Sequence, residues 1–240
     1  MNFNKSKLYK TFNNKIVLIT GHTGFKGTWL TIWLLLLGAK VVGISKDIPT
    51  KISHFKESKI KKKITDLRIN IKDEEKLKKV IKNANPDFVF HMAAQPLVRY
   101  SYDNPVETYE TNVIGTLNVL EGVRSIDTVR AAVMCTSDKC YENTETDYGY
   151  SEDDPMGGHD LYSSSKGAAE LLISSYRNSF FSVVNFDQHN TAIASVRAGN
   201  VIGGGDWAQD RLIPDIIHSF ENRIKAKIRN PDSIRPWQHV

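Results

Sequence analysis

The sequence contains little of what marks several classes of protein. Its 240 residues include only two cysteines, Cys135 and Cys140, so it lacks both a disulfide framework and a complete set of zinc ligands. We therefore predict reduced thiols, no bound metal and a cytoplasmic location. The apolar run over 29–39 is too short to cross a bilayer, and the run before Gly21 is too short for a signal peptide. Residues 29–39 are better interpreted as a buried helix.

The excess of one charge is also small, at a formal net charge of +5. Much of it is lysine, some of which lies within residues 56–65. No aromatic residues alternate with these lysines, as they would in a groove for nucleic acid, so we predict a solvated surface and no nucleic-acid partner. A modest positive field would favour a small phosphorylated substrate.

Short apolar runs alternate with helical patterns along the chain. The apolar runs predict strands over 15–20, 39–45, 86–93, 130–137 and 191–199. The helical patterns lie over 26–37, 72–83, 104–125 and 161–180. Unbroken apolar strands that alternate with helices predict an α/β fold, a Rossmann-like, doubly wound parallel sheet covered on both faces.

The composition changes after residue 198, where glycine, aspartate, proline and arginine become frequent. We therefore divide the chain into a dinucleotide-binding domain with the catalytic residues, over 1–197, and the start of a smaller substrate-binding lobe, over 198–240. The final "RPWQHV" resembles an incoming strand with no element after it. We expect this lobe to be incomplete.

Three glycines, Gly21, Gly24 and Gly27, lie between a predicted strand and a predicted helix. In this position the backbone N–H groups of the loop can bind phosphate at the positive end of the helix. The spacing G-x-x-G-x-x-G resembles that of the extended short-chain dehydrogenase/reductase superfamily. NAD is therefore the expected cofactor.

An acid after the second strand usually binds the adenosine ribose of the dinucleotide. Asp47 is the available residue there, but its neighbour Lys46 could hold the additional phosphate of NADP. We favour NAD and keep NADP as the alternative. Asp66, followed by Leu67, is a second candidate that would accept a hydrogen bond from the adenine amino group, unless it is a surface acid or a helix cap.

Tyr162 and Lys166 lie four residues apart on one predicted helix, and therefore on the same face. A nearby ammonium favours the phenolate form of a tyrosine, which can then act as a base. Ser137 lies at the end of the predicted strand over 130–137 and would bond a substrate hydroxyl beside Tyr162. The adjacent Asp138 and Lys139 add an acid and a base, which suggests the elimination of water; the alternative is an exposed turn with a local ion pair.

Six segments together resemble the CDP-glucose 4,6-dehydratases, nucleotide-sugar dehydratases of the same superfamily. They are "TGHTGFKGTWL", "HMAAQPLVRYSY", "ETNVIGTLNVLE", "TSDKCYEN", "YSSSKGAAE" and "RAGNVIGGGDWAQDRLIPD". In related dTDP-glucose dehydratases the catalytic stretch reads Thr-Asp-Glu, whereas this chain has Ser137, Asp138 and Lys139, with the lysine that the CDP-glucose enzymes carry.

The resemblance implies conversion of CDP-D-glucose to CDP-4-keto-6-deoxy-D-glucose and water, a step of deoxysugar biosynthesis for lipopolysaccharide O-antigen. On that model Tyr162 takes the proton of the 4-hydroxyl while C4 gives a hydride to NAD. Lys139 then removes the C5 proton, and Asp138 protonates the departing C6 hydroxyl. Another NAD-dependent nucleotide-sugar dehydratase or an epimerase is the alternative, and an impaired fragment that only binds NAD is a second.

The resemblance also assigns further positions. The expected cofactor contacts besides the three glycines and the two acids are His22, Phe25, Lys26, Leu67, Ala93, Ala94, Gln95 and Asn112, together with Tyr162 and Lys166. His22 and Lys26 would add cationic and donor contacts near the pyrophosphate, and Asn112 would brace the junction between strand and helix. The expected substrate contacts are Ser137, Asn200, Arg211 and Arg235. His91 is expected to be a core residue.

Assembly is a further expectation from the superfamily. The helices over 104–125 and 161–180 would pack against their copies in a second subunit and form a four-helix homodimer interface. The apolar residues expected to face that interface are Val113, Leu117, Leu120, Leu171 and Leu172.

Overall fold

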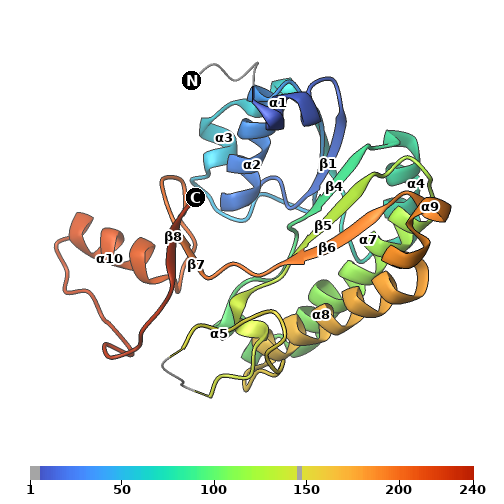
Figure 1. The fold of residues 1–240 in the computed structure, drawn as a ribbon. Helices are drawn as coiled ribbons and strands as arrows, with labels where there is room; N and C mark the ends of the chain where they lie inside the picture. The colour runs from blue at the N-terminus through green and yellow to red at the C-terminus, as the bar shows by residue number, and fades with distance from the viewer. Residues whose placement is uncertain (1–5, 145–147) are drawn as a thin grey trace.

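Six parallel strands form the centre of the protein (Figure 1). The structure is a computed structural model that describes residues 6–144 and 148–240. The strands are β1 (Ile16–Thr20), β2 (Lys40–Ser45), β3 (Thr65–Arg68), β4 (Phe88–His91), β5 (Ala131–Cys135) and β6 (Ala192–Val196). Their order is β3-β2-β1-β4-β5-β6. The order reverses at β1, and the carboxyl ends of strands beside such a reversal are where open α/β sheets bind ligands. The predicted Rossmann-like fold is confirmed.

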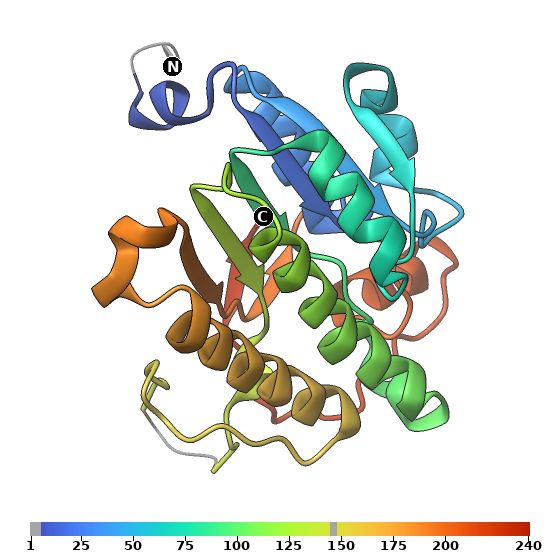
Figure 2. The same ribbon diagram turned by 90° about the vertical axis from the view of Figure 1, so that its right-hand side faces the viewer.

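Helices cover both faces of the sheet (Figure 2). One face carries α1 (Lys7–Phe12), α2 (Phe25–Leu36) and α3 (His54–Glu57), and the other carries α4 (Glu74–Ala84), α7 (Gly115–Arg124) and α8 (Leu161–Phe180). Leu34 of α2 packs with Val17 and Ile19 of β1, whereas the larger core on the opposite face includes Leu18 and Val119. The two cores therefore alternate along β1, as a strand buried on both faces requires.

The remaining elements are short. They are η2 (Ile60–Lys63), α5 (Val98–Asp103), α6 (Pro105–Tyr109), η3 (Glu110–Ile114), η4 (Asp138–Cys140), η5 (Val183–Asn185) and α9 (Phe186–His189). The helix predicted over 104–125 is thus made of α6, η3 and α7, with one π-helical turn at η3. Such turns are frequent at functional sites, and this one contains Asn112. No helix in the described parts of the chain is long and apolar enough to cross a membrane.

Residues after β6 form a separate small unit (Figure 1). It consists of β7 (Asn200–Ile202), α10 (Leu212–Glu221) and β8 (Trp237–His239), and β7 pairs with β8 in parallel. The strand expected in "RPWQHV" is therefore present and has a partner. Much of this unit's apolar surface is exposed, including Phe220 of α10.

Candidate functional site

The loop after β1 brings bare backbone to the carboxyl edge of the sheet. Gly21 has φ +78°, and a Cβ added to it would meet the backbone nitrogen of Ala93 at 2.7 Å. A Cβ on Gly27 would lie 2.1 Å from the carbonyl oxygen of Gly21. Helix α2 begins at Phe25, and its N-cap residue, Gly24, has no side chain to cap it. The first N–H groups of α2 are therefore free of side-chain partners and point toward any ligand at this edge.

The side chain of His22 does not have the role expected from the sequence. Its ring is fully buried, at 0% exposure, and a Cβ on Gly43 would meet the ring at 2.4 Å. Its Nε2 lies 2.8 Å from Oδ1 of Asp66, and its Nδ1 lies 3.1 Å from Oγ of Ser45. Burial lowers the pKa of His22. The ring thus has no free nitrogen for a pyrophosphate; instead it supports Asp66.

Asp66, the residue expected to bind an adenine amino group, lies in β3, an edge strand of the sheet. Its other oxygen accepts a hydrogen bond from Arg68 at 2.8 Å. Asp47 is exposed, and its carbonyl oxygen accepts a hydrogen bond from Thr23 at 2.7 Å. The ammonium of Lys46 lies 3.2 Å from Glu107. The one basic side chain proposed for an extra phosphate is therefore neutralised by an acid, whereas Asp66 is held in place from two sides.

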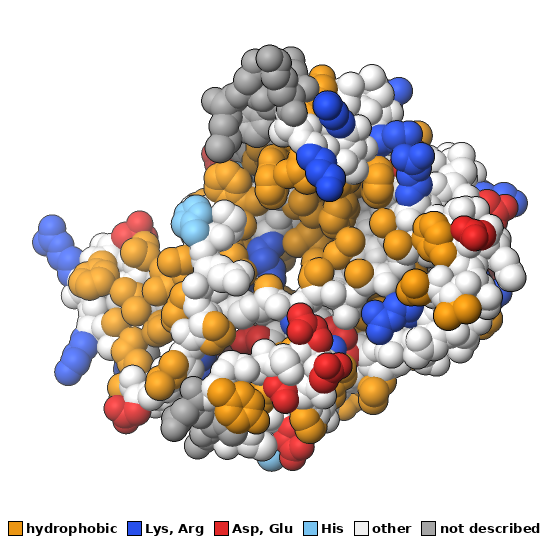
Figure 3. Space-filling view, viewed as in Figure 1, with side chains coloured by type: hydrophobic (Ala, Val, Ile, Leu, Met, Phe, Trp, Pro, Cys, Tyr) orange, Lys and Arg blue, Asp and Glu red, His pale blue; other side chains and the backbone are white. Residues whose placement is uncertain are grey.

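Lys26 is half-buried at the start of α2. Burial lowers its pKa, and the charged groups that act on it include Asp138, Asp206 and Arg211. These neighbours belong to the loop after β5 and to the segment after β7. Its ammonium therefore lies near residues expected to contact the substrate, at the carboxyl edge of the sheet, which is called the catalytic edge below. Figure 3 shows a Lys or Arg side chain at the floor of a hollow lined by hydrophobic groups on this face.

Residues after β4 form the next part of the edge. Ala93 packs against the core, Ala94 is half-buried, and the backbone N–H of Gln95 donates to Oδ1 of Asn112 at 2.9 Å. The amide nitrogen of Asn112 in turn donates to the Gln95 carbonyl at 3.1 Å and to Oγ of Ser165 at 2.9 Å. Asn112 therefore ties the loop after β4 to helix α8, which is the bracing contact expected of it.

His91, at the end of β4, is a core residue as predicted. Its ring nitrogens lie 2.7 Å from Oγ1 of Thr20 and 3.0 Å from Oγ1 of Thr116. Burial lowers the pKa of His91 to about 3, and the charge of Lys166 acts in the same direction. The histidine is therefore neutral at pH 7.

Helix α8 begins at a fixed position because Asp160 caps it. The carboxylate of Asp160 accepts hydrogen bonds from the backbone N–H of Ser163 at 2.9 Å and from its hydroxyl at 2.6 Å. This cap places Tyr162 in the first turn and Lys166 in the second, both buried.

The groups that shift the pKa values of Tyr162 and Lys166 are not those expected from the sequence, where the lysine ammonium alone favoured the phenolate. Burial raises the pKa of Tyr162, whereas its hydrogen bond with Ser137 and the charge of Arg211 lower it. Burial lowers the pKa of Lys166 to about 8, with a further lowering from Lys26 and an opposing effect from Glu170. Ser137 and Arg211 are therefore the groups that favour the phenolate, and Lys166 is a desolvated cation.

Ser137, Asp138 and Lys139 leave the end of β5 as a tight turn. The hydroxyl of Ser137 donates to Oδ1 of Asp138 at 3.0 Å and accepts from the backbone N–H of Lys139 at 3.3 Å. Both Asp138 and Lys139 are half-buried, and across residues 6–144 and 148–240 no ion pair joins them. The alternative of an exposed turn with a local ion pair is therefore wrong.

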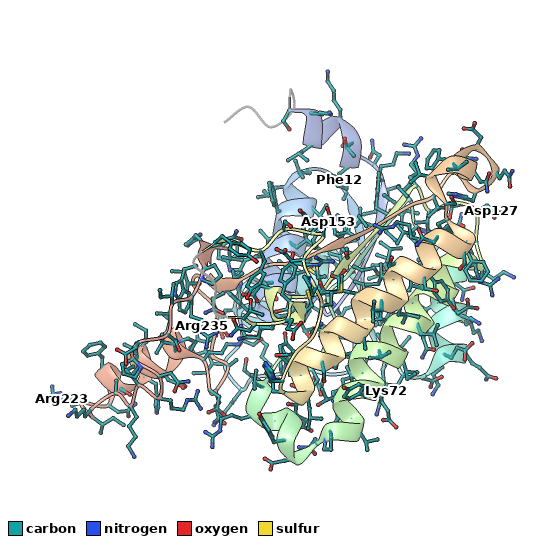
Figure 4. All side chains as sticks on the ribbon, turned by 60° about the horizontal axis from the view of Figure 1, so that its bottom comes forward. Phe12, Lys72, Asp127, Asp153, Arg223 and Arg235 are labelled. Carbon is teal, nitrogen blue, oxygen red and sulfur yellow. The ribbon has the colours of Figure 1, made fainter. Side chains whose placement is uncertain are left out.

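The candidate substrate residues after β6 are placed differently from one another. Arg211 lies 3.2 Å from Asp206 and acts on the pKa of Tyr162, so its guanidinium group is at the catalytic edge. Asn200 is half-buried at the start of β7. Arg235, labelled in Figure 4, is exposed, and among the described residues it makes no ion pair.

Two residues of this region were not predicted from the sequence. Glu170, which is buried, and Arg197, which is half-buried, form an ion pair of 3.0 Å beside the turn after β5. Both residues stand in segments quoted above, Glu170 at the end of "YSSSKGAAE" and Arg197 at the start of "RAGNVIGGGDWAQDRLIPD", but the segments did not indicate a role for either.

Comparisons of the sequence with known proteins show to which family the chain belongs. A family model described as GDP-mannose 4,6 dehydratase matches residues 18–240. The chain is 56% identical over 229 residues to CDP-glucose 4,6-dehydratase of Salmonella typhimurium, which covers 95% of this chain and 64% of that protein. This chain therefore spans less than two thirds of the length of that relative.

Solved structures show the same fold. The epimerase Mth375 of Methanothermobacter thermautotrophicus matches with a TM-score of 0.82 at 26% identity, over 97% of this chain and 66% of that one. The dTDP-glucose 4,6-dehydratase of Bacillus anthracis, solved in complex with NAD, matches with a TM-score of 0.76 at 22% identity, over 94% of this chain and 67% of that one. Since the family model covers nearly all of the sequence and the glycine loop, the turn after β5 and the Tyr–Lys helix meet at one edge, the chain belongs to the GDP-mannose 4,6-dehydratase family.

Proposed function

We propose that this protein catalyses the NAD-dependent dehydration of CDP-D-glucose to CDP-4-keto-6-deoxy-D-glucose. The observation that carries the proposal is the position of Asp138 and Lys139: an acid and a base, unpaired with each other, lie on the turn that also presents Ser137 to Tyr162. The identity of 56% with a CDP-glucose 4,6-dehydratase supports CDP-glucose as the substrate.

The residues present fit a dinucleotide. The uncapped start of α2 offers N–H groups to a pyrophosphate, and the positions of Gly21 and Gly27 have no room for a side chain. Asp66, held by His22, fits an adenine amino group, and the pairing of Lys46 with Glu107 favours NAD over NADP. When bound, NAD would accept a hydride from C4 of the sugar and later return it to C6.

Oxidation at C4 requires a base for the 4-hydroxyl proton. We assign this role to Tyr162, whose phenol hydrogen-bonds to Ser137; burial raises its pKa, and Ser137 and Arg211 offset this rise only in part. Lys166, one turn away on the same face, supplies a desolvated positive charge toward the bound nicotinamide ribose. These groups act on the sugar and the coenzyme before any water is lost.

Elimination requires a second acid–base pair. The ketone at C4 acidifies the C5 proton, which Lys139 removes. Asp138 gives a proton to the C6 hydroxyl, which leaves as water, and a C5–C6 double bond forms. Return of the hydride to C6 and of a proton to C5 completes the 6-deoxy product.

An epimerase reaction is the second candidate, since a solved epimerase has the same fold. Epimerisation at C4 needs the tyrosine and lysine but no additional acid and base. The half-buried Asp138 and Lys139 therefore favour the dehydratase. A chain that only binds NAD is the third, and the presence of Tyr162 and Lys166, both buried on one face of α8, opposes it.

The substrate-binding lobe, the cellular location and the oligomeric state are part of the same proposal. Residues 198–240 would be the start of the substrate-binding lobe, and the enzyme would act in the cytoplasm on a route to deoxysugars such as those of lipopolysaccharide O-antigen. A homodimer would form through the helix layer, where Val106, Ile114 and Leu171 are exposed. Leu120 is fully buried in the core, so its expected place at the interface was wrong.

The test is incubation of the chain with NAD and either CDP-glucose or dTDP-glucose, with detection of a 4-keto product by mass spectrometry. The Tyr162→Phe variant is the matched control, and a version extended by the remaining third of the Salmonella relative should be assayed beside the chain. A keto-deoxy product that forms from CDP-glucose but not from dTDP-glucose supports the proposal. Formation of a 4-epimer without loss of water would assign the chain to the epimerases.

A further inference from the structure

A buried carboxylate behind the catalytic turn takes no part in the chemistry described above. Glu170 of α8 is 2% exposed and lies one helical turn beyond Lys166. Its Oε1 accepts a hydrogen bond from the hydroxyl of Thr136. Its Oε2 accepts from Ser195 at 2.8 Å and from Arg197 at 3.0 Å. The single side chain of Glu170 therefore joins α8 to the ends of β5 and β6.

Arg197 extends these contacts to the far end of the turn. Its second guanidinium nitrogen donates to the hydroxyl of Tyr141 at 2.9 Å and to the carbonyl oxygen of Glu152 at 3.1 Å. The guanidinium group also lies over the ring of Tyr141, 4.9 Å from its centre. Thr136 and Tyr141 are thus both connected to Glu170, and they bracket residues 137–140.

Other contacts hold the backbone of the same turn. The backbone N–H of Thr136 donates to Val196 at 2.9 Å, that of Asp138 donates to Ala198 at 3.2 Å, and that of Tyr141 donates to Asp138 at 3.3 Å. The strand end that carries Arg197 is therefore the strand end that holds the turn. A displacement of Arg197 would be transmitted directly to Asp138.

A buried ion pair is a costly way to hold a structure together, since an apolar replacement of equal volume is often as stable. Such pairs do specify one geometry, because each partner must satisfy its hydrogen bonds in fixed directions. Here the fixed directions connect the helix that carries Tyr162 and Lys166 to the turn that carries Ser137, Asp138 and Lys139. We propose that Glu170 and Arg197 are positioning residues that set residues 137–139 against Tyr162 and Lys166.

The consequence for chemistry rests on the proposed function, but the positioning itself can be tested without substrate. The perturbation is Glu170→Gln, which keeps the shape and loses the charge that holds Arg197. The measurement is amide hydrogen exchange over 136–142, compared with exchange over β1 and β4. We expect exchange of the Asp138, Cys140 and Tyr141 amides to rise by at least about tenfold, as for the loss of one charge-assisted hydrogen bond, with no such rise in β1.

Two further variants separate positioning from general destabilisation. Glu121→Gln removes a carboxylate of similar kind, bonded to Arg124 at 2.7 Å and to the hydroxyl of Tyr176 at 2.9 Å, but remote from the turn. It should leave exchange over 136–142 unchanged. Tyr141→Phe keeps the pair of Glu170 and Arg197 and removes only the link to the turn, so it should reproduce the local increase in part.

An equal rise across β1, β4 and the turn in Glu170→Gln, or no rise at the turn, would overturn the proposal. A second arm adds NAD and CDP-glucose and compares the coenzyme that becomes reduced with the keto-deoxy product formed. Misplacement of Asp138 and Lys139 should lower product formation at least about tenfold more than it lowers reduction of the coenzyme. If neither the parent chain nor the variant reduces the coenzyme, the proposed function fails, and the exchange measurements still decide the positioning role.

Discussion

Replacement of Lys166 by methionine should stabilise the protein while it removes the proposed catalytic pair. Lys166 is 5% exposed, and burial lowers the pKa of its ammonium from 10.5 to about 8. Below pH 8 the side chain is protonated in both the folded and the unfolded states, so the folded state bears the full cost of the buried charge. A difference of roughly 2.5 pKa units corresponds to about 3 kcal/mol. Methionine has similar length and no charge to desolvate.

The sign of the pH dependence follows from the lowered pKa. Between pH 8 and 10.5 the folded state releases its proton while the unfolded state keeps it, so the parent chain gains stability as the pH rises. The advantage of Lys166→Met should therefore be about 3 kcal/mol at pH 7, fall to roughly 1.4 kcal/mol at pH 9.5 and vanish above pH 10.5.

The assay is urea unfolding at pH 7 and pH 9.5 for the parent, Lys166→Met and Lys40→Met. Lys40 is an exposed lysine at the start of β2, so its replacement controls for a general change of charge. A Lys166→Met variant that is less stable than the parent at pH 7, or whose advantage is the same at both pH values, would refute the reasoning. The gain in stability should be accompanied by loss of turnover with CDP-glucose, as expected where a site stores an unfavourable charge.

Three further predictions concern the base, the cofactor and the core. Lys139→Ala should lower turnover of CDP-glucose by about a hundredfold or more while C4 oxidation continues, so that reduced coenzyme accumulates and is seen by its near-ultraviolet absorbance; full turnover would exclude Lys139 as the base. Calorimetry should show tighter binding of NAD than of NADP, and Asp66→Asn should weaken NAD binding by about tenfold, as for one charged hydrogen bond; the reverse order of affinities would assign Lys46 to a phosphate. Because the folded pKa of His91 is about 3, the unfolded state takes up a proton at this residue below about pH 6.5 while the folded state does not. The free energy of unfolding should therefore decrease as the pH falls, by about 2 kcal/mol at pH 5. His91→Gln should reduce this loss when denaturant midpoints at pH 7 and pH 5 are compared, and an unchanged loss would show that another group titrates.

The parallel sheet could be predicted because its strands are buried on both faces and therefore read as continuous apolar runs. The predicted strand over 130–137 ends earlier, at Cys135, because Thr136 and Ser137 leave the sheet to form the turn. Strand β3, Thr65–Arg68, was noticed only for its acid. It is a short edge strand with exposed ends, so its residues carry no apolar pattern.

The role of His22 could not be predicted from the loop that contains it. A motif places His22 near a phosphate, but the direction of its ring is set by β2, where Gly43 leaves room for it. The ring then lies beside Asp66 of β3, 44 residues away in the sequence. Gly43 in the neighbouring strand leaves the space that the ring occupies. The ring therefore holds Asp66 in place instead of making the ligand contact that the loop motif predicted.

The same reasoning applies to the catalytic edge. Ser137, Asp138, Lys139 and the pair on α8 belong to short patterns, because the chemistry requires particular side chains at particular spacings on one element. Glu170 ends one of the quoted segments, but that segment does not show its role, since its partners Thr136, Ser195 and Arg197 are 34, 25 and 27 residues away. Read locally, Glu170 is one polar residue of a long helix, and its replacement would look harmless. The contacts that hold two elements together lie between those elements, so no single segment of the sequence shows them, even where the segment itself is recognised.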